Sequence, residues 1–250
     1  KATVKLLPKP KYALDLLAVF DSPEQAIGAV GAILKQGIVP TCVEYMDNIT
    51  IDGEKYLHEK LQGSDSGNYL IVEVEGIHDD DLDDKPRFDE LCTQHGASSV
   101  LVADNNKSGR PARPCEAVRA ESLIVSKEDV VVPVDQEPLL LAEILRLAGK
   151  YGLITRIASH AATEHHLNIL KPDDTPYEDW ARRVEQNQQE LYAFIYAHGG
   201  RLSGEHGIGF KRKHLMEEFT NPDELAMMKA IKKALDPNNI LNPGKIFDIE

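Results

Sequence analysis

Two groups of side chains in this chain have the types and spacing to do chemistry together. The first group is three histidines within seven residues, from His160 to His166. The second is an acid next to a base, Glu205 and His206, in a stretch where five of eleven residues are glycine, residues 199–209. Because glycine permits positive φ and close approach of backbone or ligand, this stretch predicts a tight loop that presents a carboxylate and an imidazole.

Two neutral imidazoles and a carboxylate make a three-ligand set that leaves a position open for water or substrate, as in a catalytic Zn²⁺ site. His160 and His166 are an even number of residues apart, so in an extended hairpin they can face the same side. His165 is adjacent to His166 and cannot easily bind the same ion, so it is the less suitable ligand. Two plainer interpretations stay open at this point: a surface turn with solvated histidines, and a helix C-cap followed by an ordinary glycine turn.

Composition limits the functions that these groups can serve. A chain of 250 residues with 42% hydrophobic and 28% charged residues forms one large or two small soluble domains. The net charge of −13 argues against nucleic acid as a partner. Three widely spaced cysteines form no disulfide framework, which favours a reducing, cytoplasmic compartment. No apolar run approaches the ~20 residues of a membrane helix.

The elements that must position these groups follow from hydrophobic patterning. The first half reads strand, helix, strand, strand, helix, strand, which predicts an α+β, ferredoxin-like unit with an antiparallel sheet. Its clearest signal is a capping box at Ser22 and Gln25 with Pro23 at the first helical position. These strands are expected near residues 16–20, 38–45, 68–76 and 100–103, with helices at 22–34 and 87–95.

The second half should place the histidines and the glycines at the ends of strands and helices. A short helix at 117–125 precedes strands at 129–134, 153–158 and 167–170. A helix at 140–148 and a long helix at 177–198 follow the same patterning, and Trp180 lies on the apolar stripe of the latter, so we expect it in the core. Two further helices, at 211–219 and 221–235, follow the glycine stretch.

Three motifs carry a resemblance to a known family. They are SGEHGIG (residues 203–209), LDPNNILNPGK (235–245) and LLPKP (6–10). With them the chain resembles the C-terminal half of the FAD-linked 2-hydroxyacid dehydrogenases, flavoproteins of the vanillyl-alcohol oxidase type that include D-lactate dehydrogenases, the glycolate oxidase flavin subunit and D-2-hydroxyglutarate dehydrogenase. The resemblance implies a substrate or cap domain over residues 1–198 and a segment, 199–250, that returns to an FAD-binding domain absent from this sequence.

The resemblance also implies roles for the clustered side chains. His160, His166 and Glu205 would hold a divalent metal, Zn or Mn, that polarises the substrate hydroxyl. His206 would be the catalytic base that removes the hydroxyl proton, while the α-hydrogen leaves as hydride to the flavin.

Further residues match the family's substrate and cofactor positions. Arg119 and Lys127 would bind the substrate carboxylate, Asn168 would also bind the substrate, and Asn242 would bind the cofactor where the C-terminal segment returns toward the flavin. For Arg119 and Lys127 a surface role is an open alternative. The segment between His160 and His166 departs from the family pattern His-x-Gly-Asp-Gly-Asn-x-His, because it is one residue shorter and lacks the glycines.

The predicted function is therefore that of an FAD-dependent oxidoreductase acting on a small D-2-hydroxy acid, in which this fragment is inactive without its FAD-binding half. Expected partners are the substrate, the FAD-binding domain, an iron–sulfur or other electron-acceptor subunit, and a second copy of the chain. The protein would be cytoplasmic or held at the membrane through partner subunits. Alternatives are a degenerate, non-catalytic homologue that serves as a binding or assembly module, and a stand-alone metallohydrolase.

Overall fold

The structure is a computed structural model that describes residues 1–6, 8–36, 40–52, 67–76, 85–103, 124–161 and 164–249. The chain divides into two compact units. The first comprises Lys1–Leu123 and Arg156–Ala162, and the second Ile124–Thr155 and Thr163–Glu250. Among the described residues, no helix has the length and apolar character needed to cross a bilayer.

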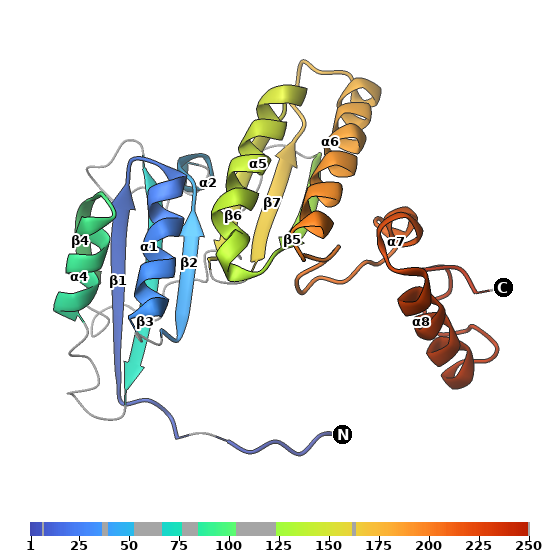
Figure 1. Cartoon of the computed structure of the whole chain (residues 1–250), viewed down its shortest axis with the longest axis horizontal. Helices are drawn as coiled ribbons and strands as arrows, with labels where there is room; N and C mark the ends of the chain where they lie inside the picture. The colour runs from blue at the N-terminus through green and yellow to red at the C-terminus, as the bar shows by residue number, and fades with distance from the viewer. Residues whose placement is uncertain are drawn as a thin grey trace. The chain divides into compact units, whose positions relative to one another are not determined.

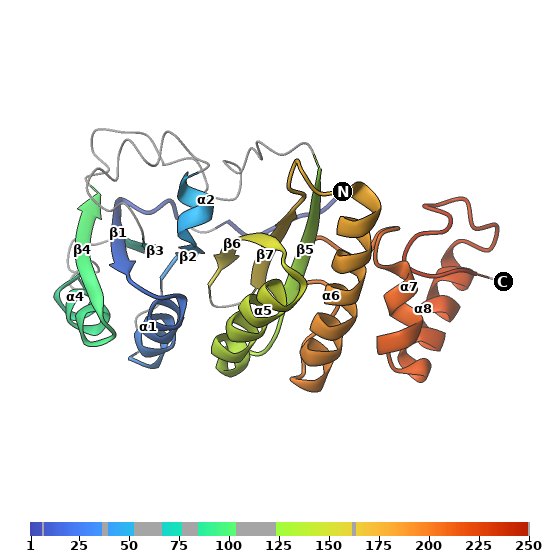
Figure 2. The same ribbon diagram turned by 90° about the horizontal axis from the view of Figure 1, so that it is seen from above.

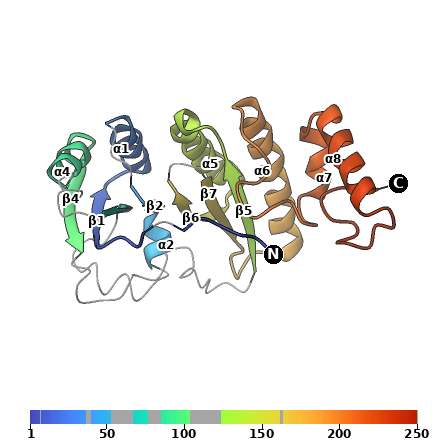
Figure 3. The same cartoon turned by 90° about the horizontal axis from the view of Figure 1, so that it is seen from below.

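The first unit is an antiparallel sheet with two helices on one face (Figure 1). The strands β1 (Tyr12–Phe20), β2 (Cys42–Met46), β3 (Asn68–Gly76) and β4 (Ala97–Ala103) lie in the order β4-β1-β3-β2, and the end of β6 (Ile154–His160) pairs with β2. The helices α1 (Pro23–Lys35) and α4 (Lys85–Gln94) cover one face, and the short α2 (Asn48–Asp52) lies on the other (Figure 3). This strand order and βαββαβ sequence confirm the ferredoxin-like α+β prediction.

Local signals fix where α1 begins. The Gln25 backbone N–H donates to Ser22 Oγ at 3.4 Å, and the Ser22 N–H donates to Gln25 Oε1 at 3.2 Å, which is the predicted capping box. Pro23 occupies the first turn, where no backbone donor is needed. The inner face of the helix then packs on the sheet through Ala26, Ile27, Ala29, Val30 and Ile33.

The second unit is a two-stranded antiparallel ladder backed by two long helices. The strand β5 (Val125–Val131) pairs with β7 (Glu164–Leu170), and α5 (Glu137–Tyr151) and α6 (Tyr177–Ala197) lie on one face of this pair (Figure 2). A 3-10 turn, η3 (Val134–Gln136), precedes α5, and α7 (Lys213–Phe219) and α8 (Pro222–Leu235) follow the glycine stretch. Trp180 is buried and donates from Nε1 to the Leu170 carbonyl at 3.1 Å, so its predicted place in the core is confirmed.

Two strands that bear on the site have boundaries that differ from the sequence prediction. β5 begins at Val125, a residue that the sequence assigned to a helix over 117–125, and it ends at Val131 rather than 134. β7 begins at Glu164, not at Leu167. Both strands contain buried polar side chains, which hide the apolar alternation by which a strand is recognised. Most of the helix predicted over 117–125 lies outside the described residues.

Candidate active site

The glycine stretch, residues 199–209, forms a tight loop that we call the glycine loop. It leaves α6 through Gly199, at φ +80°, and turns again at Gly207, at φ +77°, both in the left-handed region that favours glycine. At Gly200 a β-carbon would lie 2.2 Å from the carbonyl oxygen of Val131. This close approach lets the Arg201 N–H donate to the same oxygen at 3.3 Å, so the loop is tied to the end of β5.

Asp129 of β5 holds the middle of the glycine loop. Its side chain is buried, and Oδ2 accepts from Ser203 Oγ at 2.6 Å and from the backbone N–H groups of Glu205 at 3.0 Å and His206 at 2.7 Å. Ser203 Oγ in turn accepts from the Gly207 N–H at 2.7 Å. Burial alone would raise the pKa of Asp129, but the three hydrogen bonds outweigh it, so this pKa is lowered. A charged carboxylate thus fixes the two residues that could do chemistry.

Glu205 and His206 lie against His166 of β7. The rings of His166 and His206 are stacked, with centroids 4.8 Å apart and planes 7° from parallel. Glu205 Oε1 lies 3.6 Å from Nε2 of each ring. The other nitrogen of His166, Nδ1, faces Asp129 Oδ1 at 4.0 Å. An acid and two bases that are far apart in the sequence are therefore brought to one place.

Lys127 and Asn168 lie on the same face of the ladder. In the antiparallel register Lys127 is opposite Asn168, and Asp129 is opposite His166. Cross-strand partners share a face, and so do residues two apart on one strand. The register therefore puts Lys127 and Asn168 on the face of the ladder that also carries Asp129 and His166.

The donors at this place fit a divalent cation. One ligand atom each from Glu164, His166 and Glu205 lie within 4.8 Å of one another, and the same holds for Asp129, His166 and His206. Imidazole suits Zn²⁺ and carboxylate suits Mn²⁺ or Mg²⁺, so a mixed set of this kind can bind either class. Asp129 Oδ1 is buried and accepts no hydrogen bond within the described residues, which leaves lone pairs available on this side of the cluster.

The chain matches a known protein family over most of its length. Residues 9–246 match the family of FAD linked oxidases, C-terminal domain. The chain belongs to this family. Since the match covers most of the chain, both units are parts of one FAD-linked oxidase C-terminal domain.

Curated relatives of this FAD-linked oxidase domain include D-lactate dehydrogenases and glycolate oxidase subunits. It is 29% identical over 257 residues to D-lactate dehydrogenase of Anaerostipes hadrus, covering 98% of this chain and 54% of the relative. It is 34% identical over 252 residues to glycolate oxidase subunit GlcD of Escherichia coli K12, covering 98% of this chain and 50% of that subunit. The chain thus spans about half the length of the curated relatives it matches.

Solved structures share the fold at low identity. Substrate-bound p-cresol methylhydroxylase superposes with a TM-score of 0.66 at 16% identity, over 97% of this chain and 54% of that one. The 4-ethylphenol oxidase of Gulosibacter chungangensis gives 0.66 at 14% identity, over 98% and 55%. These likenesses show that the chain shares the fold of the matching parts of these two enzymes.

Two histidines of the FAD-linked oxidase domain are not part of the stacked pair. His160 belongs to the first unit, where its Nδ1 lies 2.8 Å from Glu44 Oε1. Its role as a ligand beside His166 stays a prediction. His165 is fully buried and pairs through Nε2 with the Glu137 carboxylate at the start of α5. His165 therefore helps to pack the helix layer of the second unit.

Two further predicted residues receive less support from the geometry. Arg119 lies outside the described residues. Asn242 lies in an exposed turn after α8, with φ +49°, and its carbonyl accepts from the Lys245 N–H at 3.4 Å. The proposed role of Asn242 toward the flavin stays a prediction.

Sequence reasoning missed a buried network around Glu128, the residue before Asp129. Glu128 is 1% exposed and accepts from Ser126 Oγ at 2.9 Å, Gln188 Nε2 at 2.8 Å and Tyr192 OH at 3.0 Å, as well as from Lys211 Nζ. Burial raises the pKa of Tyr192, with the Glu128 charge adding to the effect, so its hydroxyl stays a donor. The one available signal was two adjacent acids, Glu128 and Asp129, directly before the apolar run at residues 130–132.

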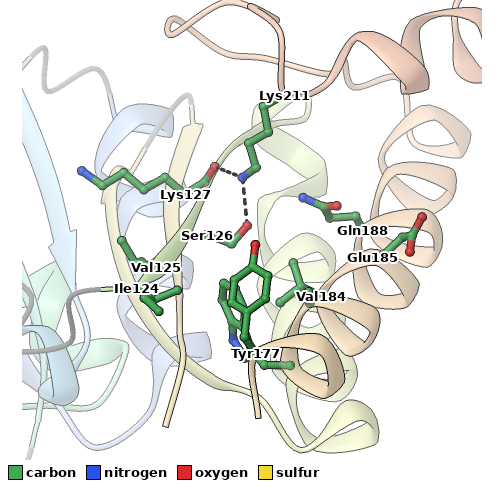
Figure 4. Close-up of a pocket in the computed structure, with 11 residues that line it drawn as sticks. Ile124, Val125, Ser126, Lys127, Tyr177, Val184, Glu185, Gln188 and Lys211 are labelled. Carbon is green, nitrogen blue, oxygen red and sulfur yellow. Dashed lines mark hydrogen bonds between the residues drawn. The ribbon is translucent and has the colours of Figure 1, made fainter. Parts of the chain in front are cut away.

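This network holds the residues that follow the glycine loop. Lys211 also donates to the Lys127 carbonyl at 2.6 Å and to Ser126 Oγ at 2.9 Å, across a groove of about 480 Å³ between β5 and α6 (Figure 4). Arg212 is buried and donates to the Gly207 carbonyl at 2.8 Å. Both ends of the loop are therefore attached to β5.

Proposed function

We propose that this chain forms the substrate-side half of an FAD-dependent dehydrogenase that oxidises a small D-2-hydroxy acid to the 2-oxo acid. The observation that carries the proposal is the loop held by Asp129, which sets Glu205 and His206 against His166. Relatives named D-lactate dehydrogenase and glycolate oxidase support this class of substrate.

Each side chain would have a distinct task. When bound, a divalent cation at His166 and Glu205 would polarise the substrate hydroxyl, and FAD would accept the hydride. His206 would hold the hydroxyl proton, since its side chain is 52% exposed and can meet a ligand. The Glu205 carboxylate beside it would stabilise the protonated ring. Lys127 and Asn168 would bind the substrate carboxylate, together with Arg119 as the resemblance implies.

The FAD-binding half would dock on the C-terminal segment, residues 199–250. On α8, Met227, Ile231 and Leu235 recur every four residues and are exposed by 67%, 55% and 80%. An apolar helix stripe of this kind is normally buried against another element. An electron-acceptor subunit, a second copy of the chain and a cytoplasmic location stay predictions.

The test uses the flavin-loaded assembly of this chain with its FAD-binding half. The variant His206→Ala should slow flavin reduction by D-lactate, glycolate or D-2-hydroxyglutarate by about 100-fold or more, because a general base contributes that much to proton removal. Anaerobic bleaching of the oxidised flavin measures this rate. His214→Ala, at an exposed histidine of α7, is the matched control and should leave the rate unchanged.

The alternative is a non-catalytic relative that serves as a binding or assembly module, and the shortened segment before His166 favours it. In that case none of these acids would reduce the flavin of the unaltered assembly. Equal rates of flavin reduction for His206→Ala and His214→Ala would instead contradict the assignment of His206 as the base.

A further inference from the structure

Glu164 opens β7 at the edge of the candidate active site. It is 7% exposed, and its carboxylate is packed against the glycine loop. A β-carbon on Gly204 would lie 1.6 Å from Glu164 Oε2, so the loop can approach this carboxylate only because residue 204 has no side chain. The same point lies 3.0 Å from Asp129 Oδ1.

Three carboxylates therefore converge here, from Asp129, Glu164 and Glu205. Two of them are at least nine-tenths buried, and Asp129 Oδ1 has no hydrogen-bond donor within the described residues. Buried carboxylates are costly unless a cation or donors compensate their charge. The negative charge on Asp129 Oδ2 is compensated by three hydrogen bonds from the loop, whereas Oδ1 accepts none within the described residues. The charge distribution thus favours a cation on the side of the cluster that faces His166.

We propose that Glu164 is a further ligand of the divalent cation that the proposed function assigns to His166 and Glu205. The three donor atoms lie within 4.8 Å of one another, a separation from which small side-chain movements can close on one ion. Glu164 stands two residues before His166, where the pattern His-x-Gly-Asp-Gly-Asn-x-His has Asn, so it supplies a charged carboxylate at a position where this pattern has a neutral amide. The inference rests on the proposed function for the site itself.

A second carboxylate changes which cation the site prefers. It adds a negative charge and a hard oxygen donor, and both raise the affinity for Mn²⁺ relative to Zn²⁺. Glu164→Gln keeps the size of the side chain and removes the charge. This variant should weaken Mn²⁺ binding by about 10-fold or more, and Zn²⁺ binding by less.

The experiment is a calorimetric titration of the 250-residue chain with Mn²⁺ and, separately, with Zn²⁺. Glu218→Gln, at an exposed acid of α7, is the matched control and should bind Mn²⁺ as the unaltered chain does. His166→Ala and Glu205→Ala each remove one of the two ligands that the proposed function names, and both variants should also bind Mn²⁺ more weakly. Circular dichroism confirms that each variant is folded.

The outcomes separate the inference from the proposed function. If Glu164→Gln binds Mn²⁺ normally while His166→Ala does not, Glu164 is not a ligand and the proposed function stands. If the unaltered chain binds neither ion, the inference falls, and flavin reduction by the assembly decides the function independently. If Glu164→Gln fails to fold, Glu164→Asp takes its place, because it draws the carboxylate back by one carbon. Unchanged affinity in Glu164→Asp would then overturn the inference.

Discussion

The two carboxylate oxygens of Asp129 make different contacts. Oδ2 accepts three hydrogen bonds from the glycine loop, while Oδ1 faces His166 Nδ1 at 4.0 Å. A carboxylate behind a metal-binding imidazole fixes the orientation of the ring and raises its basicity. The side chain that holds the loop carrying Glu205 therefore also faces the ring of His166.

The variant Asp129→Asn should therefore affect both stability and metal affinity. It replaces charged acceptors by a neutral amide, which should lower the free energy of unfolding by about 1–3 kcal/mol. Binding of Mn²⁺ should weaken by about 10-fold. Urea denaturation and calorimetry measure the two effects. Asp173→Asn, at an exposed aspartate, is the control, and identical behaviour of the two variants would contradict the anchoring role.

At the scale of elements, the glycine loop requires a residue without a side chain at position 204. The variant Gly204→Ala should force the β-carbon into the Glu164 carboxylate, which would lie 1.6 Å away, and should cost about 1–3 kcal/mol through overpacking. Thermal and urea unfolding measure the loss. Adding Glu164→Ala should recover part of it, because the smaller side chain removes the clash.

Gly149→Ala provides the opposite control for this prediction. Gly149 lies within α5, and a β-carbon there meets nothing within 4 Å. Alanine in a helix interior is favoured over glycine, so this variant should gain about 0.5–1 kcal/mol. A loss at Gly149 equal to that at Gly204 would mean that the effect is not specific to the loop.

Elements fixed by nearby residues were predictable, and those fixed by distant ones were not. The start of α1 follows from Ser22, Pro23 and Gln25, which are neighbours in the sequence. In contrast, the hydrogen bond from Ser203 to Asp129 spans 74 residues, and no local pattern announces it. The start of β5 was missed for the same reason, because Glu128 looks solvent-exposed until α6 supplies Gln188 and Tyr192 as its partners.

At the scale of the whole molecule, the apolar stripe on α8 predicts an interface. The double variant Met227→Asp and Ile231→Asp should lower the FAD content of the purified assembly by at least about 10-fold, since each residue would bury an apolar side chain worth roughly 1.5–3 kcal/mol. Flavin absorbance relative to protein measures this content. Ala226→Asp adds a charge on another face of α8 and should have no effect. Unchanged FAD content in the double variant would exclude the stripe as the docking face.

Family and fold class were accessible from the sequence because long motifs such as SGEHGIG extend over consecutive residues. The arrangement of the candidate site was accessible only in part. The sequence pointed to His166, Glu205 and His206, which the structure brings together, but the contributions of Glu128 and Glu164 depend on packing between strands and loop. Buried acids of this kind look like ordinary surface residues in a sequence.

The two neighbouring acids of β5 point to opposite faces of the strand, and from there Asp129 holds the middle of the glycine loop while Glu128 holds Lys211, just after the loop. A shift of β5 by one position would exchange their faces and release both attachments at once. Inserting a single residue between Val125 and Glu128 should therefore disable a loop more than seventy residues away, with no change in the loop itself. For protein engineering, the loop and β5 would have to be transferred together. A graft of residues 199–209 alone would carry Glu205 and His206 without the strand residues that hold the loop in place.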